Sequence, residues 1–139
     1  MRKDDSKPYD LEERTFEFAK ASRAFVKRLP RTIGNIEDAK QFIRASGSIG
    51  ANYIEANQAI GKRDFVMKIK TCRREAKESG YWLRLVHCDG ELDSARAKAR
   101  KRSHGVNEDF RRHCSEIGGV NLNFEFGICF GIRISDFGF

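Results

Sequence analysis

The sequence predicts an all-α protein, an up-and-down antiparallel four-helix bundle in which the fourth helix is degraded or divergent. Apolar residues recur at steps of three and four over three consecutive segments, which is the period of an α-helix with one buried face. Short turn signals separate these segments, and short connections favour antiparallel packing of neighbouring helices. The period decays after Asp89 and Gly90, so the bundle lacks a clear fourth member.

The first expected helix runs from about Leu11 to Leu29 and follows a disordered N-terminus of residues 1–9. Pro30 cannot continue it, because proline lacks the backbone N–H and its ring blocks the preceding turn. Gly34 then supplies a turn, and the side chain of Asn35 is expected to cap the next helix. The apolar face of the first helix consists of residues at alternating steps of four and three: Leu11, Thr15, Phe18, Ser22, Phe25 and Leu29.

The second helix is expected over Ile36–Ile60, although it contains a run of small residues, Ala45–Ala51, that form helices poorly. Glycine costs about 1 kcal/mol relative to alanine inside a helix. Small side chains let a neighbouring backbone come close, so we interpret this run as a tight helix–helix crossing. The alternative is a flexible or phosphate-cradling loop, but the run lacks the lysine of a P-loop.

The third expected helix, Lys62–Val86, follows Gly61 and has a strongly basic outer face. The formal net charge of the chain is +7, which favours phosphate-rich partners. Glu75 and Glu78 interrupt the basic face, so part of it is equally explained as a solvated surface with pairs three and four residues apart. Six residues are candidates for binding nucleic-acid phosphates: Lys68, Lys70, Arg73, Arg74, Lys77 and Arg84.

Two aromatic residues, Tyr81 and Trp82, lie near the end of the third helix. They continue its apolar stripe through Leu83, so we expect them to be anchors of the core or of an oligomer interface. Stacking on nucleic-acid bases is the alternative if they are exposed beside Lys77 and Arg84.

Residues 91–102 can form a helix, which completes a bundle domain of residues 10–102. Residues 103–139 are expected to be an irregular tail, because no apolar period is visible before a glycine- and phenylalanine-rich string begins. A single-base frameshift between about Ala95 and Ser103 would explain the loss, since the shifted codons permit an amphipathic helix followed by a stop. The alternative is a genuine divergent tail with a strand at Phe124, Phe126, Ile128 and Phe130.

Several motifs follow one another in order between Asp10 and Cys88. They are Ala51-Asn52-Tyr53-Ile54-Glu55-Ala56, then Asp64-Phe65, then Glu75-Ala76-Lys77-Glu78-Ser79, then Tyr81-Trp82-Leu83. This segment resembles the four-helix-bundle proteins of the 23S rRNA-intervening sequence family. The resemblance implies a ring-shaped homo-oligomer, a pentamer.

The same resemblance suggests the partners. The family looks related to the accessory protein of diversity-generating retroelements, a basic pentameric barrel that binds nucleic acid and a reverse transcriptase. Sequence-nonspecific RNA or DNA and a reverse-transcriptase-type protein are therefore the partners that the resemblance implies.

Polar residues on the expected helices suggest a partly buried structural network. Carboxylates on facing helices also bind di-metal centres, but such centres need Glu-x-x-His pairs. No histidine precedes His87, so we expect neither a metal site nor a cofactor. The network is expected to hold together because buried charges need partners, and its members are Arg44, Asn52, Glu55, Asn57, Glu75 and Glu78.

The sequence does not predict an enzyme. His87 and Cys88 are adjacent, which turns their side chains apart, and no third residue orients them for nucleophilic catalysis. His104 and His113 lack the spacing of a metal site. The cysteines occur singly, so we expect reduced thiols, with Cys72 in the core; the four are Cys72, Cys88, Cys114 and Cys129.

Two functions stay open. The first is a non-enzymatic, oligomeric bundle subunit that associates with nucleic acid, in particular RNA, through its basic face. The alternative is a structural or protein-interaction module without a nucleic-acid partner. The apolar runs are far shorter than the roughly 18 to 20 residues that span a bilayer, and the N-terminus has no signal-peptide core, so a cytoplasmic location without membrane contact is expected.

Overall fold

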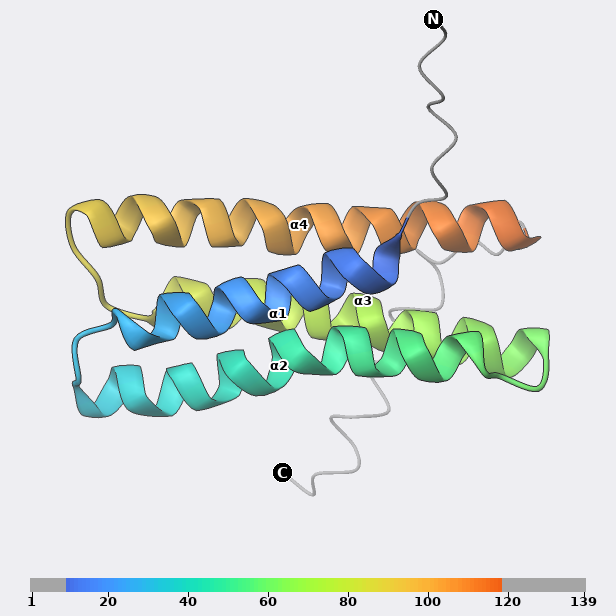
Figure 1. The fold of residues 1–139 in the computed structure, drawn as a ribbon, viewed down its shortest axis with the longest axis horizontal. Helices are drawn as coiled ribbons and strands as arrows, with labels where there is room; N and C mark the ends of the chain where they lie inside the picture. The colour runs from blue at the N-terminus through green and yellow to red at the C-terminus, as the bar shows by residue number, and fades with distance from the viewer. Residues whose placement is uncertain (1–9, 119–139) are drawn as a thin grey trace, which may run out of the picture.

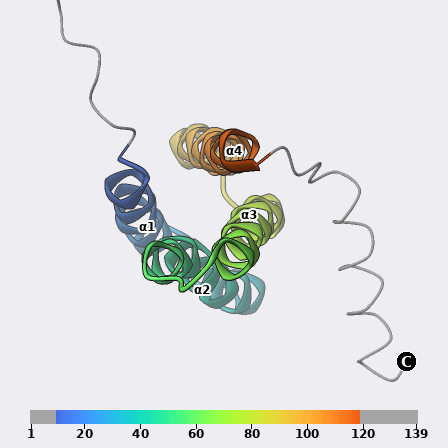
Figure 2. The same ribbon diagram turned by 90° about the vertical axis from the view of Figure 1, so that its right-hand side faces the viewer.

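The computed structural model describes residues 10–118, which form four helices and the loops between them (Figure 1). The helices are α1 (Leu11–Lys27), α2 (Ile33–Asn57), α3 (Lys62–Leu85) and α4 (Glu91–Gly118). Consecutive helices run in opposite directions and pack side by side, and α4 also contacts α1, which closes the bundle (Figure 2). The predicted all-α, up-and-down antiparallel bundle is confirmed. Over the described residues, no helix is both long and apolar enough to cross a membrane.

Helix α1 begins after Asp10, whose Oδ1 accepts a hydrogen bond from the backbone N of Glu13 at 3.0 Å. Such a side chain satisfies an N–H group that has no partner within the helix. The helix ends at Lys27, two residues before the predicted end, as the chain turns toward Pro30. All six residues of the predicted apolar face are nevertheless buried.

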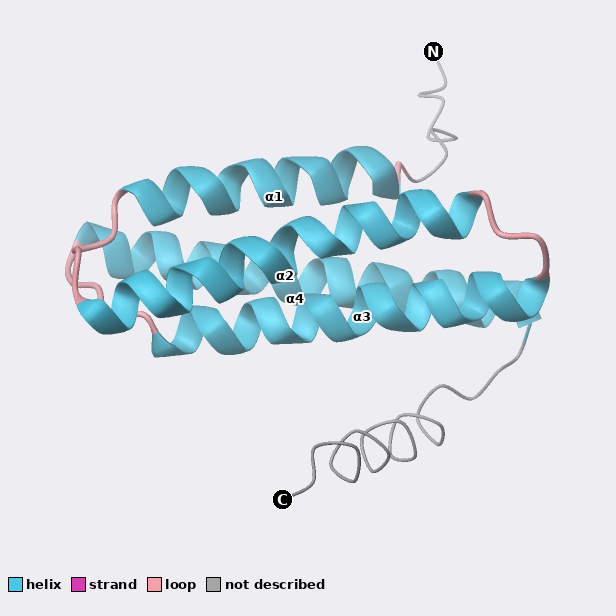
Figure 3. Cartoon of the chain, turned by 90° about the horizontal axis from the view of Figure 1, so that it is seen from below, coloured by secondary structure: helices cyan, strands magenta, loops and turns pink. Residues whose placement is uncertain are grey.

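Helix α2 begins at Ile33, three residues earlier than predicted, because Thr32 rather than Asn35 is its cap. The hydroxyl oxygen of Thr32 accepts a hydrogen bond from the Asn35 backbone N at 3.1 Å. The buried Asn35 side chain instead connects two loops. Its Nδ2 donates to the backbone oxygens of Pro30 and His87, both at 2.9 Å, and its Oδ1 accepts from the His87 backbone N at 2.7 Å. These loops, α1–α2 and α3–α4, lie at the same end of the bundle (Figure 3).

The small-residue run in α2 is helical and lies at a close crossing with α1, as predicted. A Cβ atom added to Gly50 would stand 3.1 Å from Thr15 Oγ1 and 3.5 Å from Thr15 Cβ. A Cβ atom added to Gly47 would stand 3.2 Å from the guanidinium of Arg23. Glycine at these positions therefore allows the two backbones to approach closely.

The core is built around aromatic rings from three helices. Phe42 of α2 meets Phe18 and Phe25 of α1 edge to face, with ring centroids 6.4 Å apart in both pairs. Tyr53 of α2 meets Phe110 of α4 in the same way, at 5.3 Å. Offset and edge-to-face rings are the favoured arrangements of aromatic pairs. These contacts join α1, α2 and α4, and the fully buried Ile69, Cys72, Ala76 and Leu83 add α3 to the same cluster.

Helix α4 is intact and continues past Arg102 to Gly118, so the prediction of a degraded fourth helix with an irregular tail from residue 103 was wrong for residues 103–118. Between residues 103 and 116, the buried face carries only two strongly apolar residues, Val106 and Phe110, which hid the helical period. Small and polar residues fill the other buried positions, which are Ser103, Asn107, Asp109 and Cys114. No change of reading frame is needed to give the bundle its fourth helix.

Three predictions concern residues that lie outside the described range of 10–118. They are the disordered N-terminus of residues 1–9, the tail beyond Gly118, and the alternative strand that includes Phe124. Cys129 lies there as well. The other three cysteines, Cys72, Cys88 and Cys114, are free thiols and buried, and Cys72 lies in the core as predicted.

Candidate nucleic-acid interface

Helix α3 carries most of the excess positive charge of the chain. Its 24 residues include eight basic residues (Lys and Arg) and three acidic ones (Asp and Glu). Helix α2 has two basic and three acidic residues. The six predicted phosphate-binding residues all lie on α3, but they do not form one surface. Some of the six form ion pairs or other contacts within the bundle, one is buried between α3 and α4, and two line a groove between these helices.

Ion pairs partly neutralise the first half of α3. Lys68 forms an ion pair with Glu55 of α2, and this hydrogen bond raises the pKa of Lys68. Arg74 lies 3.7 Å from the carboxylate of its neighbour Glu75. Exposed pairs of this kind contribute only about 0 to 1 kcal/mol to stability, but they lower the charge offered to a partner. Lys70, which is half-buried, also has an interaction partner.

Arg73 is not on the outer face that the sequence indicated. The residue is 7% exposed, and its charge lies near Cys114, Glu108 and Arg111 of α4. Burial lowers the pKa of its guanidinium, and among the described residues its Nε has no hydrogen-bond partner. Because it is buried between α3 and α4, Arg73 is a poor contact for a phosphate arriving from solvent.

The remaining two candidates, Lys77 and Arg84, line a groove of 290 Å³ between α3 and α4. The floor of the groove is made of small side chains: a Cβ atom added to Gly80 would stand 3.5 Å from Ser103 Oγ. Ser103 Oγ in turn donates a hydrogen bond to the backbone oxygen of Ala76 at 2.6 Å, which holds the two helices together beneath the groove. The walls add the aromatic Tyr81 and two side chains of α4, Arg100 and His104. The charged side chains that line the groove are therefore Lys77, Arg84 and Arg100.

Sequence reasoning missed Arg100 and His104, which come from α4. They stand four residues apart and therefore share one face of a helix, a signal that was present but lay across the assumed end of the bundle at Arg102. Once α4 is helical to Gly118, both side chains face α3 across the groove.

The two aromatic residues near the end of α3 are separated by the fold. Trp82 is half-buried and packs against the core, whereas Tyr81 is 53% exposed and lines the groove. Their rings meet edge to face with centroids 5.1 Å apart. Tyr81 is therefore not a core residue, and its position beside Lys77 and Arg84 meets the condition for base stacking.

The predicted polar network is not formed as one unit. Arg44 and Asn57 are exposed on α2, and within the described residues Arg44 makes no pair with a carboxylate. Asn52 Nδ2 donates to the backbone oxygen and the hydroxyl of Ser48, one turn earlier in the same helix, at 2.8 and 2.9 Å. Glu55 is exposed and paired with Lys68, and the half-buried Glu75 and Glu78 stand on α3 with partners of their own.

The buried polar contacts of the bundle involve other residues. The carboxylate of Asp109 on α4, with its side chain 1% exposed, lies 2.5 Å from the guanidinium of Arg14 on α1. It also lies 3.2 Å from Arg112. The pair with Arg14 joins α1 to α4 at the end of the bundle opposite Asn35, whereas the pair with Arg112 lies within α4.

The adjacent His87 and Cys88 lie in different surroundings, one exposed and the other buried. Burial raises the pKa of Cys88, which leaves its thiol protonated and weakly nucleophilic at neutral pH, while the exposed His87 side chain lies 3.7 Å from Asp89. Over residues 10–118 no three His, Cys, Asp or Glu side chains gather closely enough to hold a metal ion.

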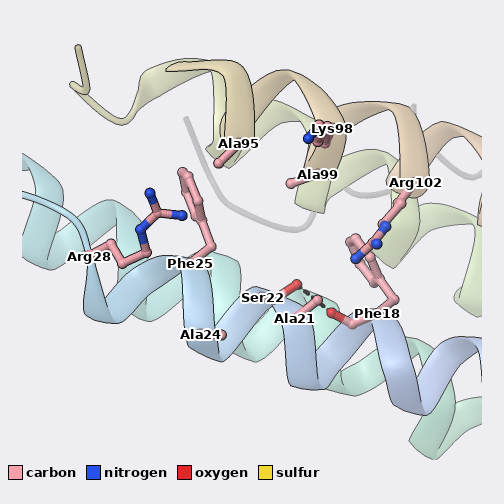
Figure 4. A pocket seen from close by; sticks show the side chains of 10 residues that line it. All are labelled: Phe18, Ala21, Ser22, Ala24, Phe25, Arg28, Ala95, Lys98, Ala99 and Arg102. Carbon is pink, nitrogen blue, oxygen red and sulfur yellow. Dashed lines mark hydrogen bonds between the residues drawn. The ribbon is translucent and has the colours of Figure 1, made fainter. Parts of the chain in front are cut away.

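A second hollow lies between α1 and α4 and has a different character (Figure 4). It encloses 230 Å³, and Phe18 and Phe25 point into it from α1 while Ala95 and Ala99 face them from α4. Basic side chains at its edge are those of Arg28, Lys98 and Arg102. The apolar lining distinguishes this hollow from the polar α3–α4 groove.

The fold and the groove define a basic, up-and-down four-helix-bundle protein. The family model described as 23S rRNA-intervening sequence protein matches residues 8–112. The chain belongs to this family. The match includes residues 103–112, which α4 places in the bundle.

A solved structure supports the same relationship. It is a protein of unknown function from the S23 ribosomal protein family of Bacteroides thetaiotaomicron, 27% identical to this chain, with a TM-score of 0.59. The similarity covers 72% of this chain and 94% of that one. No curated protein matches the sequence.

Proposed function

We propose that the protein is a non-enzymatic bundle subunit that associates with RNA by binding phosphates along the groove between α3 and α4. The observation that supports this proposal is the concentration of charge. Lys77 and Arg84 of α3 line the groove, and α4 adds Arg100 on the opposite wall, with His104 beside it. Side chains of one sign on both walls of a groove strengthen its field and attract a polyanion.

Binding of this kind is not expected to read sequence. Contacts to phosphates fix the position of a nucleic acid but carry no information about its bases. Lys77, Arg84 and Arg100 would make such contacts, whereas Lys68 and Arg73 are held by other parts of the bundle. The phosphate-binding candidates therefore no longer include Lys68 and Arg73, and they now include Arg100 of α4.

The salt dependence of binding tests the proposal. Each phosphate contact contributes a slope of about 0.7 to a plot of log affinity against log salt for a single strand. We expect a wild-type slope of several units, and Arg84→Ala and Arg100→Ala should each lower the slope by about one such step. Arg44→Ala, which removes an exposed arginine from α2, is the matched control and should leave the slope unchanged. The absence of saturable RNA binding by the wild-type protein would contradict the proposal.

The alternative function, a structural or protein-interaction module, has its own supporting observation. Large apolar side chains are exposed at both ends of the bundle, with Ile33 86% and Ile60 102% exposed. Exposed apolar side chains of this size are candidates for contact with another protein or another copy. We therefore include self-association in the proposal, and the ring-shaped homo-oligomer, a pentamer, is the form that the family resemblance implies. A reverse-transcriptase-type partner stays a prediction from the family resemblance.

Light scattering coupled to size-exclusion chromatography tests self-association. A discrete mass near five subunits supports the pentamer, and a monomer at all concentrations contradicts it. If the protein assembles but does not bind RNA, the protein-interaction module is the better description.

A further inference from the structure

The α3–α4 groove is shaped for more than phosphate contacts, because its two walls and its floor differ in chemistry. The floor consists of the small residues Ala76, Gly80 and Ser103, which leave room for a flat group. The α3 wall carries the exposed phenol ring of Tyr81, and guanidinium groups stand on both sides, on Arg84 and Arg100. A flat aromatic group next to negative charge is the chemistry of a nucleotide.

We infer that this groove binds an unpaired nucleotide of a single strand, with the base stacked on Tyr81 and the flanking phosphates on Arg84 and Arg100. This inference rests on the proposed function and specifies the form of its ligand. A duplex keeps its bases stacked inside and offers only its backbone, so Tyr81 would have nothing to stack on. Aromatic side chains beside a basic groove are the common arrangement of proteins that bind single strands.

The orientation of Tyr81 supports stacking. Its ring and that of Trp82 lie in a T-shaped arrangement, with a centroid distance of 5.1 Å and an interplanar angle of 74°. Trp82 is itself packed against the core, so it restrains the tyrosine ring while 53% of Tyr81 remains exposed. A restrained aromatic ring loses less conformational entropy when a base binds to it.

A polar group in the groove wall also lacks a partner. Asn107 is 6% exposed and lines the groove, and among the described residues its Oδ1 has no hydrogen-bond donor. A buried acceptor without a donor is unfavourable. The amino groups of bases and the ribose 2′-hydroxyl are donors that a nucleotide brings, and a rotation of the Asn107 side chain toward the groove would let its shielded Oδ1 accept from them.

The test compares a 12-nucleotide single-stranded RNA with the blunt RNA duplex of the same sequence, using the full chain and fluorescence anisotropy at one salt concentration. Tyr81→Ala should weaken binding of the single strand roughly tenfold, which is the usual effect of removing one stacked base contact, and leave duplex binding unchanged. Tyr81→Phe should keep wild-type affinity because it keeps the ring. Phe16→Ala, which removes a 58%-exposed ring from α1, is the matched control and should have no effect.

Trp82 provides a direct reading, because it is the only tryptophan of the chain and touches Tyr81. Its fluorescence should change on addition of the single strand, saturate at the same concentration as the anisotropy, and stay constant with the duplex. The deoxy version of the strand separates the two sources of unpaired nucleotides. If the DNA strand binds as tightly as the RNA strand and Tyr81→Ala weakens both, the groove accepts either nucleic acid. If only the RNA strand shows binding that depends on Tyr81, the groove is a site for RNA alone.

Two outcomes would overturn the inference while leaving RNA association intact. One is an equal loss of single-strand and duplex binding in Tyr81→Ala, and the other is an equal effect of Phe16→Ala. If the wild-type protein binds neither the single strand nor the duplex, the proposed RNA association itself is wrong. This result differs from the two outcomes above, in which the wild-type protein still binds RNA.

Discussion

Asn35 shows how one buried amide can hold the end of the bundle together. Its three hydrogen bonds reach Pro30 in the loop before α2 and His87 in the loop after α3, and His87 is 52 residues from Asn35 along the chain. The residue was expected to cap a helix because asparagine is common at that position. The adjacent Thr32 takes the cap, which frees the Asn35 side chain for contacts that only the tertiary structure brings within reach.

Replacement of Asn35 by alanine should lower the free energy of unfolding by about 2 to 4 kcal/mol, since it leaves two carbonyl oxygens and one N–H group without their partner. Gln41→Ala, at an exposed position of the same helix, should change it by less than about 0.5 kcal/mol. Urea denaturation followed by circular dichroism measures both. Equal effects of the two substitutions would show that the loop connection contributes nothing.

Cys72 gives the stability of the protein a dependence on alkaline pH. The thiol is fully buried and its Sγ lies 3.4 Å from the backbone oxygen of Ile49, and burial raises its pKa from 9.0 to about 12. Below about pH 9 the thiol is protonated in both the folded and the unfolded chain, so its contribution is constant. Above that pH the unfolded chain loses the proton first, so folding becomes less favourable by about 1.4 kcal/mol per pH unit until the folded pKa is reached.

The comparison of wild type with Cys72→Ala isolates this effect, because the other alkaline titrations are shared. Between pH 9 and pH 10.5 the wild-type protein should lose about 1 to 2 kcal/mol more stability than the variant. Chemical denaturation at each pH gives the two curves. Parallel curves would mean that the thiol ionises as easily in the folded protein as in the unfolded chain.

At the scale of helices, the contact between α1 and α2 depends on which glycine faces which neighbour. Alanine at either glycine gains about 1 kcal/mol of helix propensity. At Gly47 the neighbour is the far end of the exposed Arg23 side chain, which can swing into solvent at the cost of its hydrogen bond to the Ala19 backbone oxygen. At Gly50 the neighbour is Thr15, whose hydroxyl is fixed by a hydrogen bond to the Glu12 backbone oxygen at 2.9 Å.

We therefore expect opposite signs from two identical substitutions. Gly47→Ala should raise the free energy of unfolding by about 0.5 to 1 kcal/mol, and Gly50→Ala should lower it by about 1 kcal/mol or more. Thermal unfolding of the two variants beside the wild type measures the difference. Stabilisation by both substitutions would show that α1 and α2 can separate at no cost, against the close crossing seen here.

The helices differ in how well the sequence predicted them, for a physical reason. α1, α2 and α3 bury aromatic and aliphatic residues at helical spacing, so their existence, order and direction could be read from periodicity. The second half of α4 buries polar and small residues instead. The buried Asp109 pairs with Arg14 of α1, 2.5 Å away, as well as with Arg112 of its own helix. Compensation from another helix cannot be read from a local pattern.

The sequence also predicted the candidate interface only in part, because part of it depends on contacts between helices. The basic character of α3 was visible in the sequence, and Lys77, Arg84 and Tyr81 do line a groove. The rotation of α3 and α4 about their own axes decides which side chains face the groove. It buries Arg73 and places Arg100 and His104 in the groove lining. Rotation is set by packing of side chains from both helices, so it follows from the fold and not from one segment.

At the scale of the whole molecule, the question is which part of the chain is sufficient for the bundle. The buried cluster includes Val106, Phe110 and Cys114 of α4, and Phe110 is fully buried against Tyr53. A chain that ends after Arg102 would lose these side chains together with the Ser103 hydrogen bond to α3. It would expose the apolar faces of the other helices, which favours aggregation.

Two truncated chains and one substitution form the corresponding experiment. The chain that ends after Gly118 keeps every contact seen among residues 10–118, so its bundle should have the unfolding midpoint of the full chain. The chain that ends after Arg102 should aggregate or unfold, and Phe110→Ala, which leaves a cavity in the core, should lie between them with a loss of about 3 to 5 kcal/mol. Circular dichroism and light scattering on the same samples give both readings. A folded chain ending after Arg102 would place the second half of α4 outside the core, and failure of the chain ending after Gly118 would assign a structural role to residues 119–139.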